Sequence, residues 1–187
     1  DLLAGKEVEA PEYNFVTGVR EYKGKKLQLK PSTILIIEGI HALNPRLTSK
    51  IDDSNKFRIF ISTLTCTALD DHNWIPTNDN RLLRRIVRDY NKGAFTARQS
   101  ISQWPKVCEA EEKWISPYQE TANVIFNSAY LLEFAVMRNH AEAILASVPR
   151  NCPEYSEARR LLHFLHYFTP VSDKEIPATS MIRQFIG

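Results

Sequence analysis

The stretch ILIIEG (residues 34–39) is a continuous run of apolar, mostly branched side chains that ends in a glutamate and a glycine. An unbroken run of this kind is typical of a parallel strand buried on both faces, since a half-exposed strand would alternate with polar residues. FRIFIS (57–62) and NVIFNS (123–128) repeat the pattern. Three helical patterns occur around residues 43–51, 78–92 and 97–118. Strands that alternate with helices predict an α/β layered fold with a mainly parallel sheet.

The flanking segments predict a hairpin before this core and helices after it. Extended runs at about 13–22 and 25–29 flank Lys23-Gly24, which favours a β-hairpin within residues 6–30. Residues 130–146 have the pattern of an amphipathic helix that packs on the sheet. Beyond residue 149, SEARRLLHFLHYF (156–168) and ATSMIRQFIG (178–187) predict two short helices joined by a proline-rich link.

Composition excludes several classes of protein. The 187 residues suit one domain with a small appendage, and 43% hydrophobic with 25% charged residues is ordinary for a globular chain. A net charge of +2 gives no general case for nucleic acid as a partner, and no apolar run approaches the roughly 20 residues that span a bilayer. Three widely spaced cysteines indicate reduced thiols, and hence the cytoplasm. The opening DLLAG lacks an initiator methionine, so we expect the chain to begin partway through a larger protein.

The segment NRLLRRIVRDYNKG (80–93) places cations where a helix usually carries leucines. Arg81, Arg84, Arg85 and Arg88 fall within an arc of roughly 100° on a helix, and Lys92 lies in the same arc. Leucine, isoleucine and valine side chains occupy the opposite side. Two interpretations are open: a solvated basic face, or a row of guanidinium groups that binds phosphate. A lid of this kind is expected to be mobile without ligand.

Other side chains suggest metal and base binding. Glu38 ends an apolar strand, where ligands of open parallel sheets gather, and its carboxylate suits Mg²⁺; the alternative is that it only caps a turn. Tyr13 and Phe15 share one face of an extended strand and fit either stacking on a base or packing on the body of the protein. The cluster Asp70, Asp71 and His72 is interpreted as a polar loop.

Several catalytic motifs are absent from the sequence. The phosphate-binding pattern GxxxxGK[ST] does not occur, and neither do G-x-S-x-G and H-E-x-x-H. If the protein transfers phosphoryl groups, we expect its triphosphate loop to lie outside these 187 residues.

The order of these segments resembles the uridine kinase and phosphoribulokinase family of P-loop kinases, over roughly residues 1–147. KEVEAPEYNFVTGVR is similar to the family's hairpin, ILIIEGIHAL to the strand that ends in a metal-associated glutamate, and NRLLRRIVRDYNKG to its arginine-rich lid. The resemblance implies a three-layer P-loop kinase-like parallel sheet, incomplete because the P-loop strand is lacking, with a β-hairpin and a small C-terminal helical appendage. The implied domains are residues 1–148, with the hairpin at 6–30 and the sheet and lid at 31–148, and a helical extension at 149–187.

The resemblance also implies roles for individual residues. Glu38 would help to hold Mg²⁺, while Tyr13, Phe15 and Arg20 would contact the substrate, with the two aromatic rings at its base. Arg85 would bind the sugar hydroxyls, and Gln103 would approach the nucleoside. The ATP phosphates would be bound by Arg84, Arg88 and Lys92, the last two acting in catalysis.

Four positions depart from the family pattern: Asn14, Gly18, Lys92 and Ala94. Gly18 replaces a base-reading histidine, which puts pyrimidine recognition in doubt. The sequence therefore predicts the acceptor-binding and lid portion of an ATP-dependent nucleoside kinase-like enzyme, inactive as this chain alone. Its partners would be ATP and a hydroxyl acceptor, without membrane or nucleic acid, and a homo-oligomer stays open. The alternative is a non-catalytic nucleotide- or RNA-binding regulatory module on the same scaffold.

Overall fold

The computed structural model describes residues 1–14, 17, 19–130 and 132–187, and within them the chain forms two compact units, Asp1–Ala42 and Leu43–Gly187. The strands are β1 (Val8–Asn14), β2 (Val19–Leu27), β3 (Ile59–Ser62) and β4 (Val124–Asn127). The α-helices are α1 (Thr77–Asn91), α2 (Ala97–Trp114), α3 (Leu132–Ala146), α4 (Tyr155–Leu165) and α5 (Arg183–Ile186). Short 3₁₀ turns are η1 (Leu2–Ala4), η2 (Pro45–Thr48), η3 (Asp53–Asn55), η4 (Ser116–Thr121) and η5 (Asp173–Glu175).

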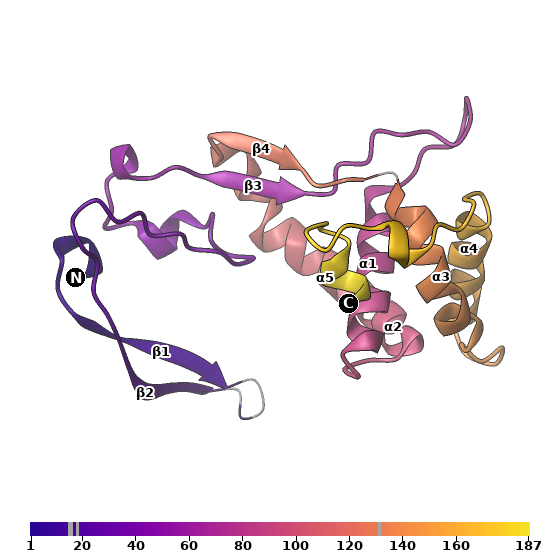
Figure 1. The fold of residues 1–187 in the computed structure, drawn as a ribbon, viewed down its shortest axis with the longest axis horizontal. Coiled ribbons are helices and arrows are strands. Elements are labelled where there is room, and N and C mark those ends of the chain that lie inside the picture. The colour runs from indigo at the N-terminus through magenta and orange to yellow at the C-terminus, as the bar shows by residue number, and fades with distance from the viewer. Residues whose placement is uncertain (15–16, 18, 131) are drawn as a thin grey trace. The chain divides into compact units, whose positions relative to one another are not determined.

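The first unit is built on an antiparallel pair of strands, β1 and β2 (Figure 1). The pairing is irregular between Glu9 and Pro11, as expected where a proline cannot donate to the ladder. β2 runs through Lys23 and Gly24 without a break, so the prediction of a turn at Lys23-Gly24 is wrong. Gly24 lies within β2 with a φ of 76°, and its amide donates to the carboxylate of Glu9 at 2.8 Å.

Residues 34–39, expected to form a central parallel strand, form no strand in the structure. Ile34 and Ile36 are 86% and 84% exposed, whereas the prediction required burial on both faces. A strand needs a neighbour to pair its backbone groups, and no described residue pairs with this segment. The apolar run therefore has a composition that suits a strand, but within the described residues it has no strand to pair with.

The second unit contains the parallel sheet, in which β3 and β4 run side by side in the same direction (Figure 1). Ile59 pairs with Val124 and Ser62 with Asn127, so two of the three strands expected from the sequence are confirmed. The side chain of Asn127 extends the ladder, because it exchanges two hydrogen bonds with the backbone of Leu64 at 2.8 and 2.9 Å. The fold is thus mixed α/β with a small parallel sheet, consistent with a P-loop kinase-like fold.

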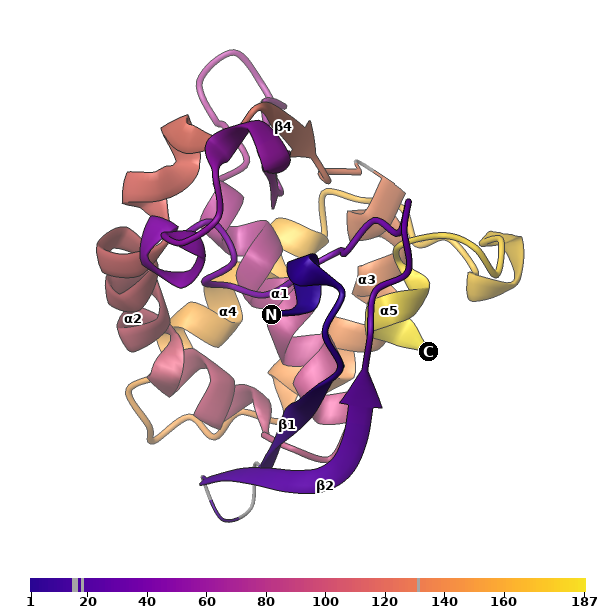
Figure 2. The same ribbon diagram turned by 90° about the vertical axis from the view of Figure 1, so that its left-hand side faces the viewer.

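Helices supply the main hydrophobic core. α1 contacts α2, α3 and α5, and it lies near the middle of the helical part (Figure 2). Its apolar side, Leu82, Leu83, Ile86 and Val87, is almost completely buried. α3 packs mainly against α4 and α1, where we had expected it to pack on the sheet. Figure 2 also shows α4 behind α1 in the same cluster of helices.

Residues beyond 149 share this core. Leu161, Leu162 and Leu165 of α4 are buried in the same cluster as Leu82 and Ile86 of α1. The rings of Phe134, Phe164 and Phe168 pack with centroids 5.0 to 5.3 Å apart. The domain boundary expected at 148/149 stays a prediction about the extent of the kinase-like portion. Among the described residues, no helix has the length and apolar character needed to cross a membrane.

Candidate active site

The residues assigned to a site from sequence fall into two groups, one in each unit. Tyr13, Arg20 and Glu38 belong to the first unit, and Phe15 lies outside the described residues, as does Gly18. The second unit contains the other candidates: Arg84, Arg85, Arg88, Lys92 and Gln103.

In the first unit the structure brings Tyr13 and Arg20 together. Tyr13 is the last residue but one of β1, and its partner across the ladder is Arg20 of β2. Tyr13 is 57% exposed. Directly opposed residues of an antiparallel pair have neighbouring side chains. The pair offers an aromatic surface beside a cation.

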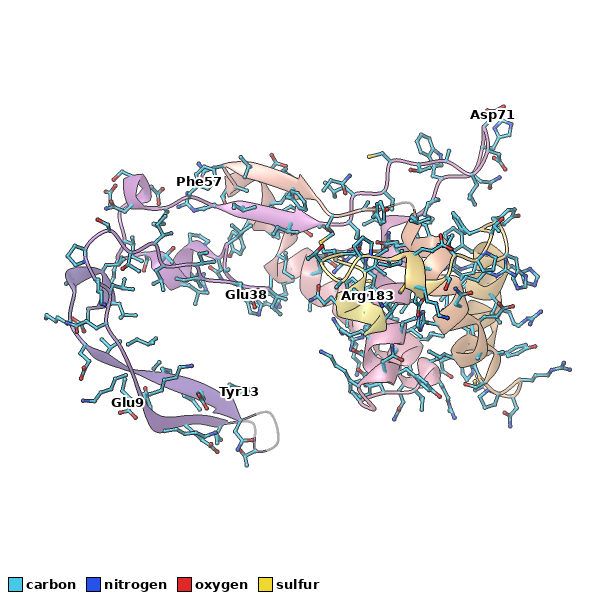
Figure 3. The ribbon with its side chains drawn as sticks, viewed as in Figure 1. Glu9, Tyr13, Glu38, Phe57, Asp71 and Arg183 are labelled. Carbon is cyan, nitrogen blue, oxygen red and sulfur yellow. The ribbon has the colours of Figure 1, made fainter. Side chains whose placement is uncertain are left out.

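Glu38 lies in irregular backbone and is exposed (Figure 3). Gly39, which follows it, has a φ of 151°, a conformation that other residues rarely adopt. A turn follows, closed by the hydrogen bond from the Ala42 amide to the Gly39 carbonyl at 3.0 Å. The described residues contain no group of three His, Cys, Asp or Glu that could hold a metal ion. Magnesium is commonly held by one or two carboxylates together with phosphates and water, so a lone glutamate fits that donor set.

In the second unit, α1 carries the row of arginines. Pro76 precedes its first residue, and no side chain caps this end of the helix. Gly93 follows its end with a φ of 65° and donates to the carbonyl of Tyr90 at 2.9 Å, a left-handed stop that suits glycine. Thr96 and Gln99 form a capping box at the start of α2.

Two of these arginines are neutralised by carboxylates of neighbouring helices. Arg84 forms a two-pronged ion pair with Glu133 of α3, at 3.0 and 2.5 Å, and donates to the Ser128 carbonyl at 2.7 Å. The Phe185 ring lies over its guanidinium, with the centroid at 5.0 Å. Arg81 pairs with Glu111 of α2, and its guanidinium lies 5.7 Å from the centre of the Trp104 ring.

Burial makes the Glu133 carboxylate unusual. The residue is only 2% exposed, and this burial raises the pKa of its carboxyl group, against the opposing effect of the hydrogen bonds from Arg84. A buried carboxylate with a raised pKa is one whose charge costs free energy in the folded state. Arg84 would have to leave this carboxylate to bind a phosphate, and its assignment to ATP stays a prediction.

Arg85 and Arg88 share a single carboxylate, that of Asp89. Arg88 donates to one oxygen of Asp89 at 2.9 and 2.8 Å, while Nε of Arg85 lies 3.3 Å from the other. That Nε is buried and lacks a hydrogen bond of good geometry within the described part of the chain. Arg85 also donates to the side-chain oxygen of Gln103 at 3.3 Å, so two residues assigned to the acceptor are in contact.

The remaining features near α1 are Lys92 and a hollow at the other end of the helix. Lys92 follows the last residue of α1 and is exposed. The hollow, of about 220 Å³, borders Arg81 and Cys108, and it contains none of the residues assigned to a site. Burial raises the pKa of the Cys108 thiol, with Glu111 contributing in the same direction. This thiol is therefore uncharged at neutral pH and a poor nucleophile.

The carboxylates that accompany the arginines were missed by sequence reasoning. Asp89 could have been found, because it lies four residues after Arg85 on one face of a helix. Glu111 and Glu133 could not, since each meets its arginine only through the packing of separate helices.

Known proteins resemble about two thirds of this chain. The family model described as Phosphoribulokinase / Uridine kinase family matches residues 1–131. The uridine kinase of Macrococcus caseolyticus is 30% identical over 126 residues, which are 67% of this chain and 52% of that protein. The uridine kinase of Proteus mirabilis is 31% identical over 127 residues, 67% of this chain and 51% of that protein. The uridine-cytidine kinase 2-B of Danio rerio is 30% identical over 126 residues, 67% of this chain and 41% of that protein.

The chain spans about half the length of the curated relatives that it matches first, 52% in the case of the M. caseolyticus enzyme. No solved structure is significantly similar to it. The family model covers well over half of the 187 residues, including the arginine-rich helix. The chain therefore belongs to the phosphoribulokinase and uridine kinase family.

Proposed function

We propose that this chain is the acceptor-binding and lid portion of an ATP-dependent kinase that transfers the γ-phosphoryl group to a nucleoside-like hydroxyl. The main support is the excess of positive charge at the end of α1. Arg85 and Arg88 share the carboxylate of Asp89, and Lys92 lies exposed one turn beyond. Arg88 keeps 35% of its side chain exposed, so its guanidinium is accessible to an incoming anion.

The proposed roles follow from what each side chain touches. Arg85 is held by Gln103 and Asp89, and we assign it as a donor to the hydroxyls of the acceptor. Arg88 and Lys92 balance the charge of the ATP phosphates, because guanidinium and ammonium groups are good partners for phosphate oxygens. In phosphoryl transfer such positioning and charge stabilisation account for most of the catalysis.

In the first unit, we assign Tyr13, Phe15 and Arg20 to the acceptor and Glu38 to Mg²⁺. The paired positions of Tyr13 and Arg20 support a joint role at one ligand. Bound Mg²⁺ would neutralise part of the phosphate charge, and Glu38 supplies the hard oxygen ligand that this ion prefers. Three free cysteines agree with a reducing compartment, and we propose the cytoplasm.

We further propose that the chain alone does not turn over ATP, since GxxxxGK[ST] is absent from its 187 residues. The test is a phosphotransferase assay with ATP, Mg²⁺ and uridine on the purified chain, beside a product that includes any coding sequence upstream of Asp1. We expect transfer only from a product that contains the phosphate-binding loop. A Mg²⁺-dependent rate from the 187-residue chain, after removal of contaminating kinases, would contradict the proposal. A loop-containing product that binds RNA and transfers no phosphoryl group would favour the regulatory module.

A further inference from the structure

A second hollow, lined by three cations and two carboxylates, contains none of the arginines of α1. It is an open depression of about 660 Å³, and most of its lining residues precede β3 in the chain. None of the residues assigned to the kinase site lines it. Its walls are Pro45, Ser49, Lys50, Ile51, Asp52, Asp53, Lys56 and Arg58.

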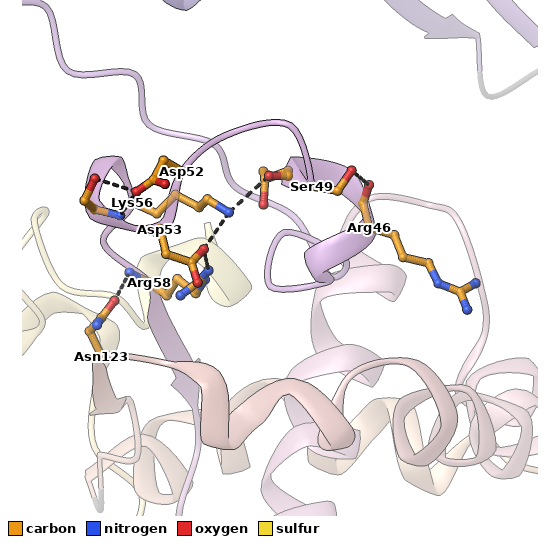
Figure 4. Close-up of polar contacts among 9 residues, drawn as sticks. Arg46, Ser49, Asp52, Asp53, Lys56, Arg58 and Asn123 are labelled. Carbon is orange, nitrogen blue, oxygen red and sulfur yellow. Dashed lines mark hydrogen bonds and ion pairs between the residues drawn. The ribbon is translucent and has the colours of Figure 1, made fainter.

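Local structure fixes the walls of this hollow (Figure 4). Asn44 caps η2 by accepting from the amide of Arg46 at 3.0 Å, and Asp52 caps η3 by accepting from Ser54 at 2.9 and 2.6 Å. Arg58 forms two hydrogen bonds with Asn123, the residue before β4. The Arg58 amide donates to the Asn123 side chain at 2.8 Å, and its carbonyl accepts from the Asn123 amide at 2.9 Å. The hollow therefore lies at the amino end of the parallel sheet.

Two cations meet at one carboxylate oxygen in this hollow. Lys56 Nζ lies 2.8 Å from Oδ1 of Asp53, and Nη2 of Arg58 donates to the same oxygen at 2.5 Å. Lys56 also donates to the carbonyl of Thr48 at 3.1 Å. The Lys56 and Arg58 side chains are only 13% and 20% exposed, whereas that of Asp53 is 74% exposed. The charges of two largely buried cations, Lys56 and Arg58, are thus balanced by the exposed carboxylate of Asp53.

We propose that this hollow binds the phosphate group of a small molecule, which takes the place of the Asp53 carboxylate between Lys56 and Arg58. A planar guanidinium beside an ammonium group is a donor set that fits phosphate oxygens. An exposed carboxylate can turn into solvent at little cost, because water replaces its hydrogen bonds. Lys50 lines the same hollow and adds a third cation.

Charge in the hollow favours an anion over a metal ion. The carboxylate of Asp52 is occupied by the amide and hydroxyl of Ser54. Hydrogen bonds from Lys56 and Arg58 lower the pKa of the Asp53 carboxyl group, so Asp53 is ionised at neutral pH and competes with the ligand. Removal of that competitor should therefore strengthen binding, an effect that damage to the fold would not imitate.

The experiment is a titration of the full 187-residue chain with inorganic phosphate, followed by ¹⁵N chemical shifts of the Arg58 and Asn123 amides. We expect saturable shifts. Affinity for phosphate should be about fivefold higher in Asp53→Asn, because the competing carboxylate of an exposed ion pair is gone. It should be about tenfold lower in Lys56→Met, because a charge-assisted hydrogen bond to the phosphate is lost. Lys106→Met, which removes an exposed cation of α2, is the matched control and should leave affinity unchanged. A parallel titration with uridine monophosphate distinguishes a phosphate ester, which should bind more tightly, from free phosphate.

The proposal is overturned if Asp53→Asn binds phosphate no better than the wild type. Equal losses in Lys56→Met and Lys106→Met would also overturn it, since the effect would then be one of net charge. Arg88→Ala should leave these shifts unchanged, so that this site and the proposed kinase site stand or fall separately.

Discussion

Arg84 of α1 and Glu133 of α3 form a two-pronged ion pair, at 3.0 and 2.5 Å, in which the carboxylate side chain is only 3% exposed. The pair joins the arginine-rich helix to the helical core at a buried position. An arginine of the row that was expected to await phosphate thus has a carboxylate of its own chain as partner. Arg81 and Arg84 each have a carboxylate of their own from a neighbouring helix. Arg85 and Arg88 share the single carboxylate of Asp89, so this pair carries a net positive charge.

The Arg84–Glu133 pair should be strongly coupled. Arg84→Met leaves a buried carboxylate without its cation, and we expect it to lower the free energy of unfolding by about 3 kcal/mol at pH 7. Adding Glu133→Gln should restore part of that loss, because the uncompensated charge is then gone. Urea denaturation of both single variants and the double variant measures the coupling. Additive losses would mean that the two side chains act independently.

Lowering the pH should raise the free energy of unfolding of the wild type relative to that of Glu133→Gln. Burial raises the pKa of Glu133 in the folded state, so the folded protein binds its proton more readily than the unfolded chain does. The stability gained from this group is full below the unfolded pKa and is lost as pH rises through the folded pKa. The difference in unfolding free energy, wild type minus Glu133→Gln, should therefore grow from pH 7 to pH 5. A difference that shrinks would refute the dominance of burial.

Arg160 should matter far more than its neighbour Arg159. Arg160 of α4 donates to both oxygens of Asp79 at 2.6 and 2.7 Å, and the Asp79 side chain is 8% exposed. Arg160→Met should cost about 1–3 kcal/mol, because it leaves a buried acceptor of α1 unpaired. Arg159→Met is the matched control on the same helix and should stay within about 0.5 kcal/mol. Thermal melts of the two variants decide, and equal shifts would show that α4 does not anchor α1.

Local patterns predicted α1, α2, α3 and α4 together with the strands β3 and β4. The helix expected around 43–51 is wrong, since only the 3₁₀ turn Pro45–Thr48 forms there, and the helix expected at 178–187 is confined to Arg183–Ile186. β3 and β4 could be predicted because each lies in a short run rich in branched and aromatic apolar residues. The strand at 34–39 failed, since pairing depends on a neighbour that a local pattern does not reveal. The mobility expected of the arginine-rich helix without ligand stays a prediction.

The candidate site was predictable in its cations and only partly in its anions. Four arginines at helical spacing predict a basic face. The spacing does not indicate which of them pair with carboxylates from elsewhere in the chain. Glu111 and Glu133 are 30 and 49 residues away from their arginines. Long-range packing determines such contacts. It gives Arg81 and Arg84 a carboxylate each, and it leaves Arg85 and Arg88 with one carboxylate between them.

The kinetics of arginine variants in the loop-containing kinase test the central proposal most directly. Arg88→Ala should mainly lower kcat, by about 10² to 10³-fold or 2–4 kcal/mol, because it balances charge on the transferring phosphoryl group. Arg85→Ala should mainly raise the apparent KM for the acceptor. Arg81→Ala, which removes a guanidinium already paired with Glu111, should change kcat/KM by no more than about 1 kcal/mol. Small and equal effects of all three variants would contradict the proposal and leave the row as a solvated basic face.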